Sequence, residues 1–423
     1  MMLKWLVGLF ALIGGSASAQ DAVITAARML DVETGRMIAD PVIEVRAGRV
    51  VAVRAGPSRG APPAATRHVD LAGLTILPGL IDMHVHFDSN PRYQGFTPLQ
   101  FTDAFWAVQA PANALAMLRA GFTTVRHVGS TNYIDVGLMQ AIGEGLIEGP
   151  RIVPAGYPIG ATGGHCDETL LPPSYKTVSP GVGDGADALR RRVREQRKAG
   201  AEVIKVCATG GVFSRNTEPG QQQLSEVELR AVADEAHLWN LKVAAHAHGT
   251  SGIKAAIRAG IDTIEHASLI DEEGLRLAKE RGTWLTLDLY PTEYVKLEGA
   301  RNGTPADFMR KNDLILQGQR DAVRRAGAHG VGIVFGSDAG VMPHGEAGKQ
   351  FAVLVANGMT PLAAIRTATV NAAKALGRER DVGAIRPGMW ADLVAVRGDP
   401  LVDVRVLEAP ARVVKGGVLV TAQ

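Results

Sequence analysis

Two periodic patterns of apolar and polar positions divide this chain into a central part and two ends. Up to about residue 75, short runs rich in valine and isoleucine alternate with turn residues, a pattern that predicts β-strands. From residue 76 to about residue 378, short apolar runs alternate with longer stretches of helical periodicity. β-rich runs return at 391–396 and 412–415. We therefore expect β-structure at both ends of the chain and a repeated strand–helix unit between them.

The central part contains eight predicted strands, most of them preceded by a helix that ends at a glycine. This alternation is typical of parallel βαβ units in an α/β protein, and eight such units indicate a (β/α)8 barrel. We expect the barrel over residues 76–378, and a small β-sandwich domain formed jointly by residues 20–75 and 379–423. The eight apolar runs are residues 75–77, 122–125, 151–153, 201–206, 242–246, 261–266, 283–287 and 332–336.

The first nineteen residues carry the three features of a signal peptide in the required order. Lys4 provides a positive charge, residues 5–15 form an apolar run too short to cross a bilayer comfortably, and residues 17–19 (Ala-Ser-Ala) offer a cleavage site. We expect the protein to be exported, to the periplasm or outside the cell, after cleavage near Ala19. No later stretch is long and apolar enough for a membrane helix, so we expect no membrane contact after cleavage.

Composition and charge narrow the possible classes of function. The chain has 423 residues, of which 46% are hydrophobic and 21% charged, enough apolar material for a large core. Its 45 basic and 43 acidic residues nearly balance, and the densest basic run, 190–198, fits the solvated face of a helix. We therefore expect no nucleic-acid partner. The two cysteines, Cys166 and Cys207, cannot form a disulfide framework, and whether they pair with each other is open.

Side chains that bind metals fall at the C-terminal ends of five predicted strands, where a barrel enzyme carries its chemistry. His84 and His86 are two residues apart on one strand, so they point to the same face and can reach one ion. Lys205 interrupts an apolar strand, and a buried ammonium needs a partner or a lowered pKa. Each residue alone could be structural, but coincidence does not explain the set. Its members are His84, His86, Lys205, His246, His266 and Asp338.

Three motifs resemble the amidohydrolase superfamily in its two-metal form. Residues 78–86 (PGLIDMHVH) match the opening strand of that family, and residues 336–339 (GSDA) match its eighth strand. Residues 383–393 (GAIRPGMWADL) resemble its C-terminal β-domain. The resemblance covers essentially the whole mature chain, and it implies a fold of the barrel type expected from the strand–helix rhythm.

The resemblance implies two divalent metal ions, usually zinc, and a carbamate on Lys205 that bridges them. A carbamate would turn a misplaced cation into an anionic oxygen ligand, which suits the position of this lysine. His84, His86 and Asp338 would bind the more buried ion. His246 and His266 would bind the other ion.

The same resemblance implies a reaction. A hydroxide between the two ions would attack an amide carbonyl, and one ion would polarise the carbonyl oxygen. Asp338 would take the proton from the nucleophile and pass it to the leaving amine. His248 would bind the substrate close to the reacting bond, so we place it with Asp338 and Lys205 among the catalytic residues.

Further motifs resemble one branch of the superfamily, the one that cleaves dipeptides and N-acyl amino acids. They lie at 161–165, 204–212 and 245–249, and the branch includes prolidase-like enzymes and ochratoxin-hydrolysing amidohydrolases. The resemblance implies a small-molecule amide as substrate, one candidate being ochratoxin A, which would yield ochratoxin alpha and phenylalanine. It also implies a homo-oligomer, of which an octamer is one form.

Four residues are candidates for binding the substrate. The resemblance assigns His165 and His248 to a substrate carbonyl or carboxylate, while Arg215 and Tyr290 could hold a carboxylate or close the pocket. Two positions depart from the family, since His127 stands where relatives often have an acidic residue and Cys166 where they often have glycine. The substrate candidates are His165, His248, Arg215 and Tyr290.

Two other functions compete with amide hydrolysis of this kind. Other amidohydrolases open cyclic amides or deaminate rings, but single-metal deaminases do not need a lysine on the fourth strand, so Lys205 favours two metals. A secreted barrel that only binds a ligand is the second alternative. It gives no reason to keep Asp338, a proton-transfer carboxylate, beside the metal ligands.

Overall fold

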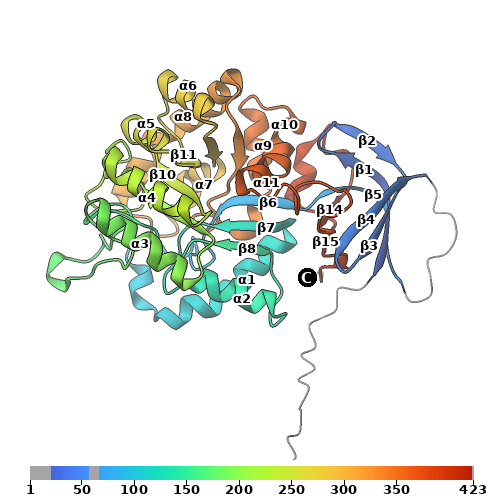
Figure 1. The fold of residues 1–423 in the computed structure, drawn as a ribbon, viewed down its shortest axis with the longest axis horizontal. Helices are drawn as coiled ribbons and strands as arrows, with labels where there is room; N and C mark the ends of the chain where they lie inside the picture. The colour runs from blue at the N-terminus through green and yellow to red at the C-terminus, as the bar shows by residue number, and fades with distance from the viewer. Residues whose placement is uncertain (1–20, 57–65, 422–423) are drawn as a thin grey trace, which may run out of the picture.

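The computed structural model describes residues 21–56 and 66–421, so the predicted signal peptide lies outside the described residues. Figure 1 shows two parts side by side, a ring of strands surrounded by helices and a curved sheet that contains both ends of the described chain. Within the described residues, no helix combines the length and apolar character that crossing a bilayer requires.

Eight parallel strands form the first part. β6 to β8 pair in sequence order, and so do β9 to β13. Isolated bridges join the two sets, Ile159 to Val206 on one side and Val85 to Ala339 on the other, so the strands close into a ring consistent with a TIM-like barrel. The strands are β6 (Leu80–Val85), β7 (Phe122–His127), β8 (Arg151–Pro154), β9 (Val203–Cys207), β10 (Lys242–Ala247), β11 (Thr263–His266), β12 (Trp284–Leu287) and β13 (Ile333–Phe335).

Helices follow the strands and cover the outside of the ring (Figure 1). Several end at a glycine with positive φ, such as Gly200 (φ 111°) after α3 and Gly282 (φ 69°) after α6, as the sequence predicts. The helices are α1 (Asp103–Arg119), α2 (Ile134–Gly143), α3 (Ala186–Ala199), α4 (Glu226–Leu238), α5 (Thr250–Ala259), α6 (Glu272–Arg281), α7 (Tyr290–Glu298), α8 (Ala306–His329), α9 (Lys349–Ala356), α10 (Pro361–Thr367) and α11 (Val370–Leu376).

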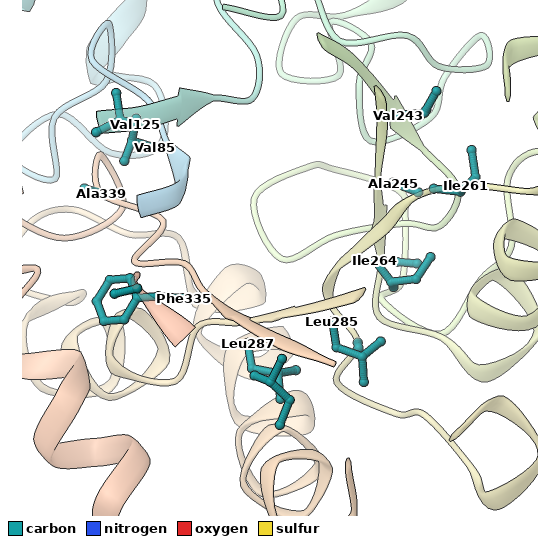
Figure 2. Close-up of a cluster of buried hydrophobic side chains, with 14 of the residues drawn as sticks. Val85, Val125, Val243, Ala245, Ile261, Ile264, Leu285, Leu287, Phe335 and Ala339 are labelled. Atoms are coloured by element: carbon teal, nitrogen blue, oxygen red, sulfur yellow. The ribbon is translucent and has the colours of Figure 1, made fainter. Parts of the chain in front are cut away.

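Alternate residues of the barrel strands serve two different environments. One set, including Val85, Val243 and Ile264, packs with helix residues in a large apolar cluster (Figure 2). The other set points to the opposite face of each strand, because successive side chains alternate in direction. This set includes buried polar residues. Arg126 and Glu265 are of this second kind, and both are almost fully buried. The apolar set holds the helices to the ring and leaves the polar set available for chemistry.

The second part is one eight-stranded sheet to which both chain ends contribute, as predicted. β1 pairs with β5 in parallel, and the other pairings are antiparallel. The described strands form a single mixed sheet, and the expected β-sandwich is not confirmed. The strands are β1 (Ala22–Asp31), β2 (Arg36–Ala39), β3 (Pro41–Arg46), β4 (Arg49–Ala55), β5 (Arg67–Pro78), β14 (Leu393–Val396), β15 (Arg412–Lys415) and β16 (Val418–Leu419).

The junction between the two parts differs from the prediction. The expected boundary at residue 75 lies inside β5, whose last residues pair with β14, and the barrel begins only at Leu80. The Gly79 amide donates to the Asp392 carbonyl at 2.8 Å, so the chain passes from one sheet into the other with a single residue between them. Pro78 and Gly79, a turn-type pair, mark this division in the sequence.

Candidate metal centre and active site

The C-terminal ends of the barrel strands surround a cavity of about 270 Å³. All six residues that the sequence predicts as metal ligands line it, and so do His165 and His248. The six lie on β6, β9, β10 and β11 or in the loops after β6 and β13. They are His84, His86, Lys205, His246, His266 and Asp338.

The first group of donors comes from β6 and from the loop after β13. His84 Nδ1 donates to Glu265 Oε2 at 3.0 Å, and His86 Nδ1 donates to the Gly129 carbonyl at 2.9 Å. These partners assign the ring protons to Nδ1, which leaves both Nε2 lone pairs free. Each Nε2 lies 3.5 Å from Asp338 Oδ1. Two imidazoles and one carboxylate therefore converge on one point.

The second group comes from β10 and β11. His266 Nδ1 donates to Asp288 Oδ2 at 2.7 Å, which leaves Nε2 free. His246 has the opposite arrangement, because its Nε2 donates to the Gly210 carbonyl at 3.2 Å and leaves Nδ1 free. His248 has a ring nitrogen within 4.8 Å of donor atoms of both histidines. The structure thus adds His248 as a possible third donor on this side, beyond its predicted role at the substrate.

The protonation states of these histidines, as well as their positions, suit a metal centre. Burial holds the pKa values of His84, His86 and His246 well below their usual range, so the rings are neutral, the form that binds metals. Each ring is anchored through its other nitrogen, as metal-binding histidines normally are. Asp288 Oδ1 is a buried oxygen without a hydrogen-bond partner among the described residues, and it faces the same cavity.

Lys205 lines the same cavity as the two groups, and its charge acts on members of both. Its side chain is 4% exposed, and no hydrogen bond to its ammonium is found in the described part of the chain. Burial lowers the pKa of Lys205 to about 8, although Glu265 and Asp338 act in the opposite direction. With a pKa near 8, roughly a tenth of this lysine is a neutral amine at pH 7, and a neutral amine is a nucleophile.

A tight turn presents Asp338 to the cavity. The Asp338 amide donates to the His84 carbonyl at 2.9 Å, and the Ser337 amide donates to Asp82 Oδ1 at 3.1 Å, so the turn is attached directly to β6. Asp338 has a φ of 50°, a left-handed conformation that aspartate tolerates better than most residues. Burial raises the pKa of its carboxyl to about 6. A carboxyl with this pKa can both accept and release a proton near neutral pH.

The sequence analysis missed a buried ion pair beneath the first group. Arg126 Nη2 donates to Glu265 Oε1 at 2.8 Å, and the other oxygen of Glu265 accepts from His84. Arg126 Nε also donates to the Met83 carbonyl at 2.7 Å. The ion pair fixes the orientation of the His84 ring through the hydrogen bond between His84 Nδ1 and Glu265. Its signal in the sequence is two charged residues inside apolar strands, a costly placement unless they are paired.

Asp288 was also missed, although it follows the seventh predicted strand directly. We expect Asp288→Asn to weaken metal binding about 10- to 100-fold, because the amide cannot fix the His266 tautomer as a carboxylate does. Metal analysis after dialysis against a graded series of chelator concentrations measures the change. Asp262→Asn is the matched control, since Asp262 also pairs with a histidine (His237, 2.8 Å) but does not line the cavity. Equal metal retention in the two variants would contradict this role.

The predicted substrate residues have different positions. His165 and His248 line the cavity, and the His165 ring stacks on His246 with centroids 4.1 Å apart. Arg215 is exposed and donates to the Leu170 carbonyl at 3.2 Å, and the Tyr290 hydroxyl donates to Glu346 at 2.6 Å. Neither is among the residues that line the cavity. Both belong to segments outside the barrel strands, where strand periodicity does not predict the direction of a side chain.

Two positions that depart from the family pattern also lie near the centre. His127 is buried at the end of β7, and its Nε2 accepts from the Phe87 amide at 2.7 Å. Cys166 forms a disulfide with Cys207, which answers the question that the sequence left open. Both cysteines line the cavity.

Comparison with known proteins identifies the relatives of this chain. Residues 75–420 match the family described as the amidohydrolase family. The chain is 34% identical over 368 residues to ochratoxinase of Aspergillus niger, a match that covers 81% of this chain and 75% of that protein.

Solved structures agree with the sequence comparison. A Xaa-Pro dipeptidase with methionine bound in its active site is 34% identical, with a TM-score of 0.89 over 94% of this chain and 99% of that one. A prolidase in complex with N-methylphosphonate-L-proline is 32% identical, with a TM-score of 0.86 over 95% and 100% of the two chains. The structure of Aspergillus niger ochratoxinase gives a TM-score of 0.81 at 29% identity, over 95% of each chain. The protein therefore belongs to the amidohydrolase family and is a hydrolytic enzyme that acts on amide or peptide bonds.

Proposed function

We propose that this enzyme uses two divalent metal ions to release a free amino acid from dipeptides or N-acyl amino acids. The observation that carries the proposal is the convergence of two donor groups and Lys205 on one cavity. Relatives named as a Xaa-Pro dipeptidase and as ochratoxinase support the substrate class. Ochratoxin A, whose cleavage yields ochratoxin alpha and phenylalanine, is one candidate substrate.

In this proposal each donor group holds one ion. His84, His86 and Asp338 hold the first, and His246 with His266 hold the second. The mixture of imidazole and carboxylate donors favours zinc. When bound, divalent ions of this kind polarise a carbonyl group and lower the pKa of water to about 7.

Lys205 would join the two sites as a carbamate. Its neutral amine attacks carbon dioxide, a C–N bond forms, and the amine loses one proton to solvent. The product replaces a buried cation with an anionic group that has two oxygen ligands. The low pKa of Lys205, near 8, and its place in the same cavity as the donor groups support this step.

Asp338 would move the proton during hydrolysis. Its carboxyl, with a pKa near 6, takes a proton from the attacking water and delivers it to the nitrogen of the leaving amine. The anchors of Asp338 on β6 hold the carboxyl in one place throughout. Protonation of the nitrogen makes the amine a better leaving group, so the C–N bond breaks.

The cavity beside the donor groups receives the substrate. Seven apolar residues line it, which favours an aliphatic or aromatic side chain on the released amino acid. The rings of His165 and His248 both pack against His246, and their place supports binding of the substrate carbonyl or carboxylate. A carboxylate-binding role for Arg215 and Tyr290 has no support from their positions. The apolar lining residues are Val128, Pro158, Val212, Phe213, Pro291, Ile315 and Val341.

A substrate panel combined with metal analysis tests the proposal. We expect two ions per chain, and release of the free amino acid from N-acyl amino acids or dipeptides with apolar side chains, ochratoxin A included. The Asp338→Asn variant is the control for contaminating hydrolases. One ion per chain would favour the deaminase alternative. Failure of the metal-loaded enzyme to cleave any member of a broad panel would reject the substrate class.

We also propose that the protein is exported and assembles as a homo-oligomer of up to eight copies. The disulfide supports export, because disulfides persist mainly in oxidising compartments. N-terminal sequencing of protein from the periplasm or medium tests cleavage near Ala19. Light scattering on the same sample measures the assembly, and an intact N-terminus or a monomer would reject the corresponding part.

A further inference from the structure

The disulfide joins the loop that carries His165 to the strand that carries Lys205. Cys166 directly follows His165, and Cys207 is the last residue of β9, two residues beyond Lys205. We propose that this disulfide positions His165 on the substrate side of the cavity, so that its reduction weakens substrate binding while both ions stay bound. The kinetic test of this inference rests on the proposed amide hydrolysis, whereas the thiol titration and the histidine modification do not.

The loop is attached to β9 at two points. The Ile159 amide donates to the Lys205 carbonyl at 2.8 Å, and the Cys207 amide donates to the Ile159 carbonyl at 2.8 Å. Seven residues later, Cys166 is bonded covalently to Cys207. The segment between these points is therefore held at both ends by the same short stretch of β9. A histidine near the end of so short a segment has little freedom to move.

Several close contacts define the position of the His165 ring. One face stacks on the His246 ring, with centroids 4.1 Å apart and an interplanar angle of 28°. Gly211 lies against the ring, and an added Cβ there would come within 2.3 Å of it. The ring Nδ1 shares a hydrogen bond of 2.9 Å with Ser214 Oγ, and the His165 amide donates to Gln223 at 2.9 Å. The ring thus fits a narrow slot beside a metal donor.

The disulfide differs from these other contacts. Gly211, Ser214 and Gln223 all belong to the loop after β9, so their contacts join one loop to another. Only the bond to Cys207 and the bridge at Ile159 attach this segment to the barrel strand itself. Cutting the disulfide leaves His165 held by its stack on His246, by the loop contacts and by the distant bridge at Ile159, while the metal donors on the strands keep their anchors. Reduction should therefore affect the substrate more than the metals.

Reduction is a balanced two-electron step. With a trialkylphosphine, the phosphine attacks one sulfur, the S–S bond breaks, and water supplies the oxygen of the phosphine oxide. Each cysteine ends as a thiol, with the protons also coming from water. A phosphine is preferred to a dithiol here, because dithiols bind zinc and would remove the ions directly.

The first experiment compares the oxidised enzyme with the C166S/C207S variant. We expect KM for an N-acyl amino acid to rise about tenfold or more, and kcat to fall less than about threefold, since loss of positioning removes binding energy. Metal content should stay at two ions per chain. Phosphine treatment should give the native enzyme the same kinetics and leave the variant unchanged. Native kinetics in the variant, or loss of an ion from it, would overturn the proposal.

The second set of measurements needs no turnover, so it separates this proposal from the proposed function. Thiol titration of the unfolded, unreduced protein should find no free thiol, and two free thiols would overturn the proposal. Phosphine should speed the modification of His165 by diethyl pyrocarbonate, read by peptide mass spectrometry. An unchanged rate would also overturn it. Gly211→Ala should displace the ring and raise KM with the disulfide intact. If the double variant does not fold, phosphine treatment of the folded native enzyme still tests the disulfide itself.

Discussion

Replacing Lys205 with alanine is expected to abolish hydrolysis and to release metal from the centre. Lys205 lines the cavity and is the one predicted ligand that belongs to neither donor group, and alanine leaves no atom that could join the two groups. We expect kcat/KM to fall by about 10⁴-fold or more, because metal ions contribute several kcal/mol to the stabilisation of such transition states. Metal content should fall below two ions per chain.

A second substitution at the same position separates charge from packing. Lys205→Glu returns a carboxylate to the site, so it should retain more metal than Lys205→Ala even if its shorter reach leaves activity low. Circular dichroism and the melting temperature of the metal-free proteins show whether each variant folds. Activity close to that of the native enzyme in Lys205→Ala would reject the bridging role.

Asp338→Asn is expected to remove turnover by a different route. Asparagine has nearly the shape of aspartate and tolerates the φ of 50° at this position, so the turn after β13 should be preserved. It cannot take a proton from the attacking water. We expect kcat to fall about 10²- to 10⁴-fold, the usual contribution of a positioned acid or base.

Metal content distinguishes this variant from the previous one. Asp338→Asn should keep most of its metal, because His84 and His86 remain anchored by Glu265 and by the Gly129 carbonyl. Both variants are therefore expected to lose most of their activity, but to differ in metal content. Equal loss of metal from both would contradict the roles assigned to Lys205 and Asp338.

The barrel and its six converging residues could be predicted because both follow from periodicity. A run of apolar residues after a helix and a glycine predicts a parallel strand, and parallel strands bring their C-terminal ends to one side of a barrel. His246 and His266 needed no further information to be placed together. Asp288 obeys the same rule at the end of β12, so its omission was avoidable.

Other features depend on contacts that periodicity does not describe. The pairing of Arg126 with Glu265 joins β7 to β11 across the interior of the barrel, and nothing near either residue in the sequence indicates the other. Arg215 lies in a loop, where no repeat relates position to direction. The junction was misplaced although Pro78 and Gly79, a turn-type pair, mark it, because the residues on both sides of this pair are apolar.

The sheet made from both chain ends affects how the chain folds. β5 pairs with β14, more than 300 residues further along the chain, so one edge of β5 has no partner until the last part of the polypeptide arrives. Contacts between such distant segments form slowly, and an unpaired edge invites association with other chains. A polypeptide secreted from its N-terminus would expose this edge for most of its passage. Loss of residues 393–419 would make that exposure permanent, so the C-terminus is a poor place for truncation.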